Sequence, residues 1–178
     1  MAWSHRPEAP PRPLDDMTLT ETVPHPHLGS IHISATVNGD QVWAAWGERV
    51  PTVRVREAAA PLRAENDRIP SPIGARGAVV QFNVWEYDIV GSSLVPIPHR
   101  RWLAKEARVE GRRYVRRAYG PGSVIEREGH GLVLSAERRM HKQRPWPGKL
   151  APLVDPLDAS LALVWDRAVP PSDLTFFV

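Results

Sequence analysis

The sequence predicts a mainly β protein. We expect an antiparallel sandwich or barrel-like single domain over residues 17–178, with a long proline-rich loop and an extended N-terminal arm over residues 1–16. Nineteen prolines stand among 178 residues, and a proline inside a helix removes a backbone donor and clashes with the preceding turn. Several runs alternate apolar and polar residues between glycine-containing turns, which is typical of half-buried antiparallel strands. Short strands are therefore expected to outnumber helices.

Composition excludes several classes of protein. The chain has no cysteine, which rules out disulfides, thiolate metal sites and cysteine nucleophiles. The first residues contain no basic stretch followed by an apolar run, so no secretory signal is predicted. No apolar run approaches the length that crosses a bilayer, so no membrane span is predicted either. We expect a cytoplasmic protein or one within an assembled particle such as a virion.

The N-terminal arm, residues 1–16, holds four prolines and almost no apolar periodicity. This composition is typical of an extended, polyproline-like segment. Trp3 stands near its start, and an indole can anchor such an arm because it buries a large apolar surface and keeps a polar N–H. Trp3 is therefore a candidate partner-binding residue.

The clearest hairpin lies between the alternating runs 30–37 and 41–46. The Asn-Gly pair between them suits a two-residue turn, in which both central residues take positive φ. That turn would place Trp46 opposite Ile31 on the core face and leave Trp43 on the other face. Trp43 is thus predicted to be an exposed, partner-binding indole.

Three further elements follow this hairpin. Residues 50–56 alternate as a third strand, with Pro51 at its start as ladder bonding requires. Residues 57–77 hold three prolines and two glycines and are predicted to form a long loop. Residues 78–90 are the longest β-like run, with bulky side chains on both faces. They are predicted to form one central strand covered on two sides, or one strand that bends at a bulge between two sheets.

Residues 99–119 allow two interpretations. Apolar residues recur near helical spacing, which favours one helix over 99–118. The alternative is a hairpin centred on Glu110 and Gly111, but it places Arg108 opposite Arg113, a like-charge pair that is unfavourable unless an anion lies between. The helix is the preferred prediction, and the hairpin stays open.

The C-terminal part contains a second hairpin and two apolar runs. Residues 123–128 and 132–138 flank Gly129-His130-Gly131, a short turn framed by glycines. Residues 160–166 and 174–178 follow, and the second run ends in Phe176, Phe177 and Val178. A free terminus of this kind would expose apolar surface, so Phe176 and Phe177 are candidate partner-binding residues.

Charge is polarised along the chain, because residues 99–149 carry net +9 and the remaining chain net −6. Arginines near aromatic residues can bind phosphates while bases stack on the rings. The alternative is a solvated face that meets acidic groups of a neighbouring subunit. The candidate anion or nucleic-acid residues are Arg100, Arg101, Arg108, Arg112, Arg113, Arg116 and Arg117.

No metal, cofactor or catalytic residue is predicted. His25, His27 and His32 are the only metal-like cluster, but prolines on either side of His25 favour a segment in which the imidazoles need not share a face. Paired carboxylates occur at Glu86 with Asp88 and at residues 155 and 158, and an exposed polar patch explains such pairs as well as acid–base chemistry does. Phosphate-loop, dinucleotide and nucleophile-elbow motifs are absent.

The leading functional prediction is a structural or assembly subunit of a larger particle, for example a phage tail or neck component. It would contact other protein subunits of the same or another kind through its arm, loops and terminal strand. One alternative is a small β-barrel enzyme or binding protein for an apolar small molecule, with Trp43, Trp85 and Tyr87 as lining. The other is a nucleic-acid-binding module that uses residues 99–119.

Overall fold

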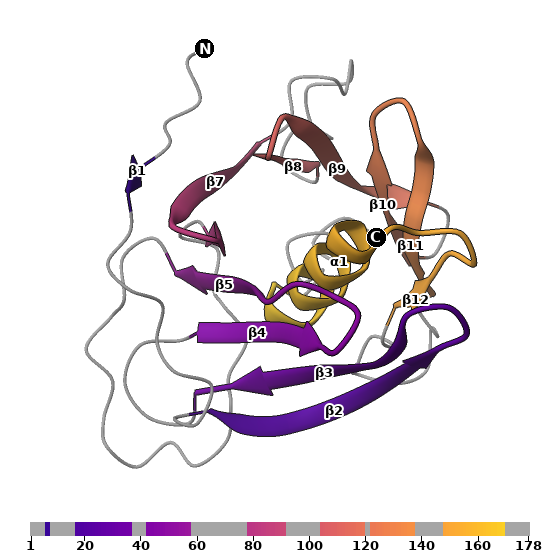
Figure 1. Cartoon of the computed structure of the whole chain (residues 1–178). Helices are drawn as coiled ribbons and strands as arrows, with labels where there is room; N and C mark the ends of the chain where they lie inside the picture. The colour runs from indigo at the N-terminus through magenta and orange to yellow at the C-terminus, as the bar shows by residue number, and fades with distance from the viewer. Residues whose placement is uncertain are drawn as a thin grey trace.

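The computed structural model describes residues 6–7, 17–36, 42–57, 78–91, 104–119, 122–137 and 148–169. They form an open antiparallel sheet that curls around a single helix (Figure 1), so the predicted mainly β fold is confirmed. The strands are β1 (Arg6–Pro7), β2 (Thr18–His25), β3 (Gly29–Ala35), β4 (Val42–Gly47), β5 (Val53–Glu57), β6 (Ala78–Phe82), β7 (Trp85–Gly91), β8 (Lys105–Val109), β9 (Arg112–Tyr119), β10 (Gly122–Arg127), β11 (Gly131–Ala136) and β12 (Lys149–Leu150), and the helix is α1 (Pro156–Ala168).

The strands follow one another in the sheet in the order of the chain. Strands β2 to β12 form a continuous antiparallel path, and β1 lies off this path and pairs with β7. Such a meander needs only local connections, which suits a sequence of many short alternating runs. Figure 1 shows that the sheet bends so that one face looks inward on α1.

Helix α1 fills the concave side of the sheet. It packs against β3, β4, β5, β11 and β12, and Leu161, Leu163 and Trp165 on it are fully buried. Nearly all residues of α1 are buried, and such a helix is stable only where other elements surround it. Helix α1 is not the helix predicted at 99–118. It contains the apolar run 160–166.

The register of the β3–β4 hairpin differs by one residue from the prediction. Ile31 pairs with Gly47 instead of Trp46, and Ala35 pairs with Trp43. One residue of slip moves every side chain of a strand to the other face, so the two tryptophans exchange places. Trp43 packs against the hydrophobic core, so its predicted place on the exposed face was wrong, while its role in partner binding stays a prediction.

Trp46 lies on the outer face of the same hairpin. Its ring centroid is 4.5 Å from that of His32, and its Nε1 donates to Ser34 Oγ at 3.1 Å. The Asn-Gly turn itself lies outside the described residues. At the edge of the described part, Thr36 N donates to Val42 O at 3.0 Å, which a two-residue turn with the predicted register would not allow.

The predicted third strand is confirmed as β5, with Pro51 ahead of it, but the predicted single strand over 78–90 is two strands. Strands β6 and β7 form a hairpin in which Phe82 pairs with Trp85. Asn83 takes a φ of 55°, a left-handed conformation that asparagine tolerates better than most residues. The turn therefore depends on one residue inside an otherwise strand-like run.

The part of the predicted helix 99–118 that the structure describes forms the β8–β9 hairpin. The prediction of a helix was therefore wrong there. Glu110 and Gly111 have φ values of 51° and 74° and make the two-residue turn. Arg108 does pair with Arg113, as the alternative required. Glu106 Oε2 lies 2.6 Å from Arg113 Nη2, and this carboxylate offsets the like-charge repulsion.

The second predicted hairpin is confirmed as β10 and β11. Gly129 and Gly131 both have positive φ, at 76° and 98°, which explains why glycines frame the turn. Elsewhere, the predicted loop over 57–77 lies outside the described residues apart from Glu57, the last residue of β5.

The β6–β7 turn can be tested with one substitution. Asn83→Ile should lower the free energy of unfolding by roughly 1–2 kcal/mol, because a β-branched residue is strained at positive φ. Asn83→Gly should leave the stability close to that of the parent chain. Urea denaturation measures both. A stabilising Asn83→Ile would contradict the turn, since isoleucine suits the interior of a continuous strand.

Candidate functional site

The start of α1 is specified by local sequence. Asp155 precedes Pro156, whose fixed φ and missing N–H suit the first helical position. The Asp155 carboxylate accepts a hydrogen bond from Asp158 N through Oδ1 at 3.0 Å, and its backbone carbonyl accepts one from Ala159 N at 3.0 Å. Asp158 also places a negative charge in the first turn, where the helix dipole favours it. These residues fix where the helix begins.

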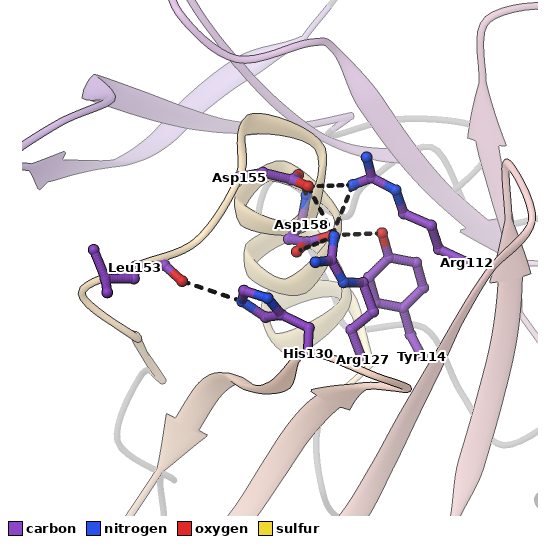
Figure 2. Close-up of polar contacts among 7 residues, drawn as sticks. All are labelled: Arg112, Tyr114, Arg127, His130, Leu153, Asp155 and Asp158. Carbon is purple, nitrogen blue, oxygen red and sulfur yellow. Dashed lines mark hydrogen bonds and ion pairs between the residues drawn. The ribbon is translucent and has the colours of Figure 1, made fainter.

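Five side chains meet at this helix start, and we call them the N-cap cluster: Arg112, Tyr114, Arg127, Asp155 and Asp158 (Figure 2). Arg112 Nη1 contacts Asp155 Oδ2 at 2.5 Å and Asp158 Oδ1 at 3.1 Å. Arg127 Nη1 lies 2.8 Å from Oδ2 of each aspartate. Tyr114 donates to Asp158 Oδ1 at 2.7 Å. Two guanidinium groups thus bridge two carboxylates.

Burial differs within the N-cap cluster. The Asp158 side chain and Tyr114 are fully buried, whereas the Arg112 and Asp155 side chains are 38% and 34% exposed. An ion pair near solvent contributes little, but a buried carboxylate without its partners costs several kcal/mol. Asp158 therefore dominates the energetics of the cluster.

The protonation of the cluster follows from this environment. Burial raises the pKa of the Tyr114 phenol, and the hydrogen bond from Tyr114 to Asp158 raises this pKa further. The charge of Arg112 lowers the pKa but does not cancel the increase. Burial alone would raise the pKa of Asp155, but hydrogen bonds from Asp158 N and Arg127, with the charge of Arg112, lower it overall. Tyr114 stays protonated and Asp155 ionised at neutral pH. The cluster is thus suited to fastening the helix.

A second set of charges, the C-terminal clasp, lies at the other end of α1 and consists of Glu21, Arg116, Asp166 and Arg167. Arg167 donates to both Glu21 oxygens, from Nε at 2.9 Å and Nη2 at 3.0 Å. Its Nη1 contacts Gly148 O at 3.1 Å and Asp166 Oδ2 at 2.6 Å. Arg167 therefore connects β2, at one end of the sheet path, with the residue before β12 at the other end.

Strand β9 supplies an arginine to each end of the helix. Arg112 contacts Asp158, and Arg116 Nη2 lies 3.3 Å from Asp166 Oδ1. The aspartates are eight residues apart, about 12 Å along an α-helix, and the arginines four residues apart, about 13 Å along a strand. The two spacings match, so one strand neutralises both buried carboxylates of α1.

The other predicted arginines face different surroundings. Arg113 and Arg117 lie on the outer face of the sheet and pair with glutamates, Arg117 Nε with Glu126 Oε2 at 2.8 Å. Arg108 is exposed on β8. Arg100 and Arg101 lie outside the described residues, as do Trp3, Phe176 and Phe177. The members of the predicted basic set that the structure describes are therefore divided between two faces of the sheet.

The histidines support local structure. His25 is 8% exposed, and its Nδ1 accepts from His27 N and Leu28 N at 3.3 Å each, which holds the β2–β3 turn. His32 Nδ1 is 3.0 Å from Thr22 Oγ1. At the β10–β11 turn, His130 Nε2 lies 3.2 Å from Leu153 O, in the segment before α1 (Figure 2). Within the described part of the chain, no group of three or more His, Asp or Glu is placed to hold a metal ion.

The two carboxylate pairs differ in role. Glu86 and Asp88 both lie on β7 and share one of its faces, as predicted, and Glu86 Oε1 accepts from Arg56 Nε and Gln81 Nε2, both at 2.9 Å. The pair at 155 and 158 is instead the centre of the N-cap cluster. An aspartate before a proline, followed three residues later by another aspartate, is a helix-start pattern. This pattern could have identified the start of the helix, but not the arginines and the tyrosine that meet it.

No family model, curated protein or solved structure matches this chain. In the described ranges, no helix has the length and apolar character needed to span a membrane.

Asp158 should be the most sensitive residue of the cluster. Asp158→Ala is expected to lower the free energy of unfolding by about 3–5 kcal/mol, because two arginines and Tyr114 lose their buried acceptor. Asp155→Asn should cost much less, because asparagine keeps the capping oxygen and the lost charge is partly exposed. Urea denaturation at neutral pH compares the two. Equal losses would show that Asp158 does not dominate the cluster.

A second prediction concerns alkaline pH. Tyr87 donates to Glu110 Oε1 at 2.7 Å, and burial, with this bond, raises the pKa of Tyr87 to about 12. An unperturbed tyrosine has a pKa of about 10, so this contribution is fully present below about pH 10 and is lost as the pH rises through about 12. Tyr87→Phe should be less stable at neutral pH, and the difference should narrow above about pH 10. Unfolding at several pH values measures this, and a constant difference would contradict it.

Proposed function

We propose that this protein is a structural or assembly subunit that holds neighbouring protein subunits through strand pairing. One observation supports the proposal above the others: two residues of the N-terminal arm, β1, add a strand to the edge of β7. Arg6 pairs with Glu86 and Pro7 with Trp85. Strand addition of this kind joins polypeptides through main-chain hydrogen bonds and needs no recognition motif.

Strand β7 takes part in three pairings. Strand β7 pairs with β6 over its first five residues, Trp85 to Ile89, but with β8 only at Val90 and Gly91. Among the described residues, β8 pairs with the end of β7 and β1 pairs with its start. The main-chain groups along the edge of a strand can pair with another segment.

The concave side of the sheet is used for packing. Helix α1 fills it, and the charges at both helix ends are engaged in the N-cap cluster and the C-terminal clasp. These groups hold the fold together. Contacts with other molecules are then left to the outer face, the edges and the arm, which are the parts that assembly subunits use. A phage tail or neck component is one example of such a subunit.

Light scattering after size-exclusion chromatography tests the proposal. The full chain should elute with a mass that is a multiple of 19.9 kDa, and a variant that lacks residues 1–8 should show a smaller assembly because it lacks β1. Trp3→Ala in the full chain removes the indole of the arm but keeps β1. It therefore tests the contribution of the indole separately from that of the strand. A monomer at every concentration, for the full chain and the truncated one alike, would contradict the proposal.

A further inference from the structure

We infer that two copies of the chain pair through β2, edge to edge and antiparallel, so that their two sheets join into one. Strand β2 ends the sheet path, and among the described residues it pairs only with β3. The stretch that pairs is residues 19–23. The inference rests on the proposed function, in which subunits join by strand pairing, and it names the partner as a second copy.

The hydrogen-bond pattern shows which main-chain groups of β2 point away from the sheet. Thr36 N donates to the carbonyl oxygen of the first residue of β4 at 3.0 Å, so every second residue back along β3 also directs its main chain toward β4. His32 and Ser34 are two of these residues. His32 pairs with Thr22, and Ser34 pairs with Leu19. The N–H and C=O groups of Thr22 and Leu19 therefore point outward, along the edge of the sheet.

A bulge brings these two outward-pointing residues to one face of the sheet. The register shifts at Thr20, the additional residue of the bulge. Leu19 and Thr22 consequently pair with residues two apart on β3, which share a face. An antiparallel second copy can set Leu19 opposite Thr22 in both directions, and each such pair can exchange two main-chain hydrogen bonds. The edge is thus complementary to itself.

The side chains along this edge favour a second copy as the partner. Leu19 is 54% exposed, and β2 contains no lysine or arginine, which commonly protect a strand edge from pairing. Its one carboxylate, Glu21, accepts from Arg167 Nε and Nη2 at 2.9 and 3.0 Å. Two copies can therefore approach without repulsion between uncompensated charges, and pairing buries the apolar side chain of Leu19 in each.

Two features limit the association to a pair. Pro24 follows the pairing stretch and has no main-chain N–H to donate, so the pairing ends there. At the other end of the sheet path, β12 is only two residues long, and its Lys149 is exposed. A short edge strand with a lysine is protected from pairing. Contact between β2 and β12, which would add copies without end, is therefore disfavoured, whereas β2 with β2 uses the same edge twice and closes.

Thr22→Pro tests the pairing in the full chain. The substitution removes an outward N–H and breaks no main-chain hydrogen bond between β2 and β3. Light scattering over a range of concentrations should give Thr22→Pro a dissociation constant at least about tenfold above that of the parent chain, because the pair loses two main-chain bonds. Thr22→Val is the matched control. It also loses the contact of Thr22 Oγ1 with His32 Nδ1 but keeps the N–H, and it should associate like the parent.

Hydrogen exchange, followed by NMR on the parent chain, locates the contact. The Thr22 amide should exchange more slowly as the protein concentration rises, because a second copy then accepts its hydrogen bond. The Val23 amide is the internal reference. Val23 pairs with Ile31, at a position where β3 faces β2, so its amide should be protected at every concentration.

The outcomes separate this inference from the proposed function. Equal association of Thr22→Pro and the parent, or a Thr22 amide whose exchange is independent of concentration, overturns the β2 pairing. If the chain still associates in that case, the proposed function survives through another surface. A monomer at every concentration overturns both.

A second pair of variants serves if Thr22→Pro fails to fold. Leu19→Lys places two positive charges at the shared edge, and Leu19→Gln places none there. The lysine variant should associate more weakly than the glutamine variant, and the difference should shrink as the salt concentration rises. Equal association of the two variants at low salt overturns the inference.

Discussion

The burial of α1 against the concave side of the sheet is the constraint on which the rest of the structure depends. Nearly all residues of the helix are buried, so it is stable only when the strands enclose it. It also carries Asp158 and Asp166 into that interior, where they are 0% and 8% exposed. Removing a carboxylate from water costs several kcal/mol unless a cation and further hydrogen bonds compensate for it. The sheet must therefore present cations at both ends of the helix.

Strand β9 meets this requirement because four residues on a strand cover nearly the same length as eight on a helix. Arg112 and Arg116 then reach the two aspartates from one face of the strand. The alternate residues, Arg113 and Arg117, point outward and pair with Glu106 and Glu126. An arginine-rich segment that suggests a nucleic-acid surface is thus explained in large part by charge neutralisation within the fold, on both faces of the sheet.

The two ends of the sheet path meet through a side chain of the helix. Arg167 contacts Glu21 on β2 and the carbonyl of Gly148 next to β12. This contact joins the two ends through a side chain and adds no strand pairing between them, so the sheet stays open. Open strand edges pair readily with other segments. The pairing of β1 with β7 is the one instance among the described residues where a distant segment joins the sheet off its main path. Both features support the proposed assembly role, and neither produces a recognisable motif, because main-chain pairing depends little on side-chain identity.

The sequence by itself determined the elements that depend on local chemistry. Alternation identified β5, and the glycines at 129 and 131 identified the β10–β11 turn, because positive φ is a property of the single residue. The Asp155-Pro156 start of α1 was equally local, although apolar residues near helical spacing placed the predicted helix at 99–118 instead. The turn at Asn83 could also have been predicted from the sequence, but a turn residue inside an apolar run is easily taken for part of a strand.

The tertiary structure alone decided the features that depend on distant partners. The β3–β4 register follows from one additional residue between the strands, and only packing against the core selects Trp43 over Trp46 for the interior. The choice of hairpin over helix in the basic segment required Glu106 to neutralise Arg113 and Asp166, fifty residues away, to neutralise Arg116. The physical reason is the range of the interactions: a turn or a cap involves neighbours in sequence, whereas the cost of burying a charge is offset by whichever group the fold brings beside it.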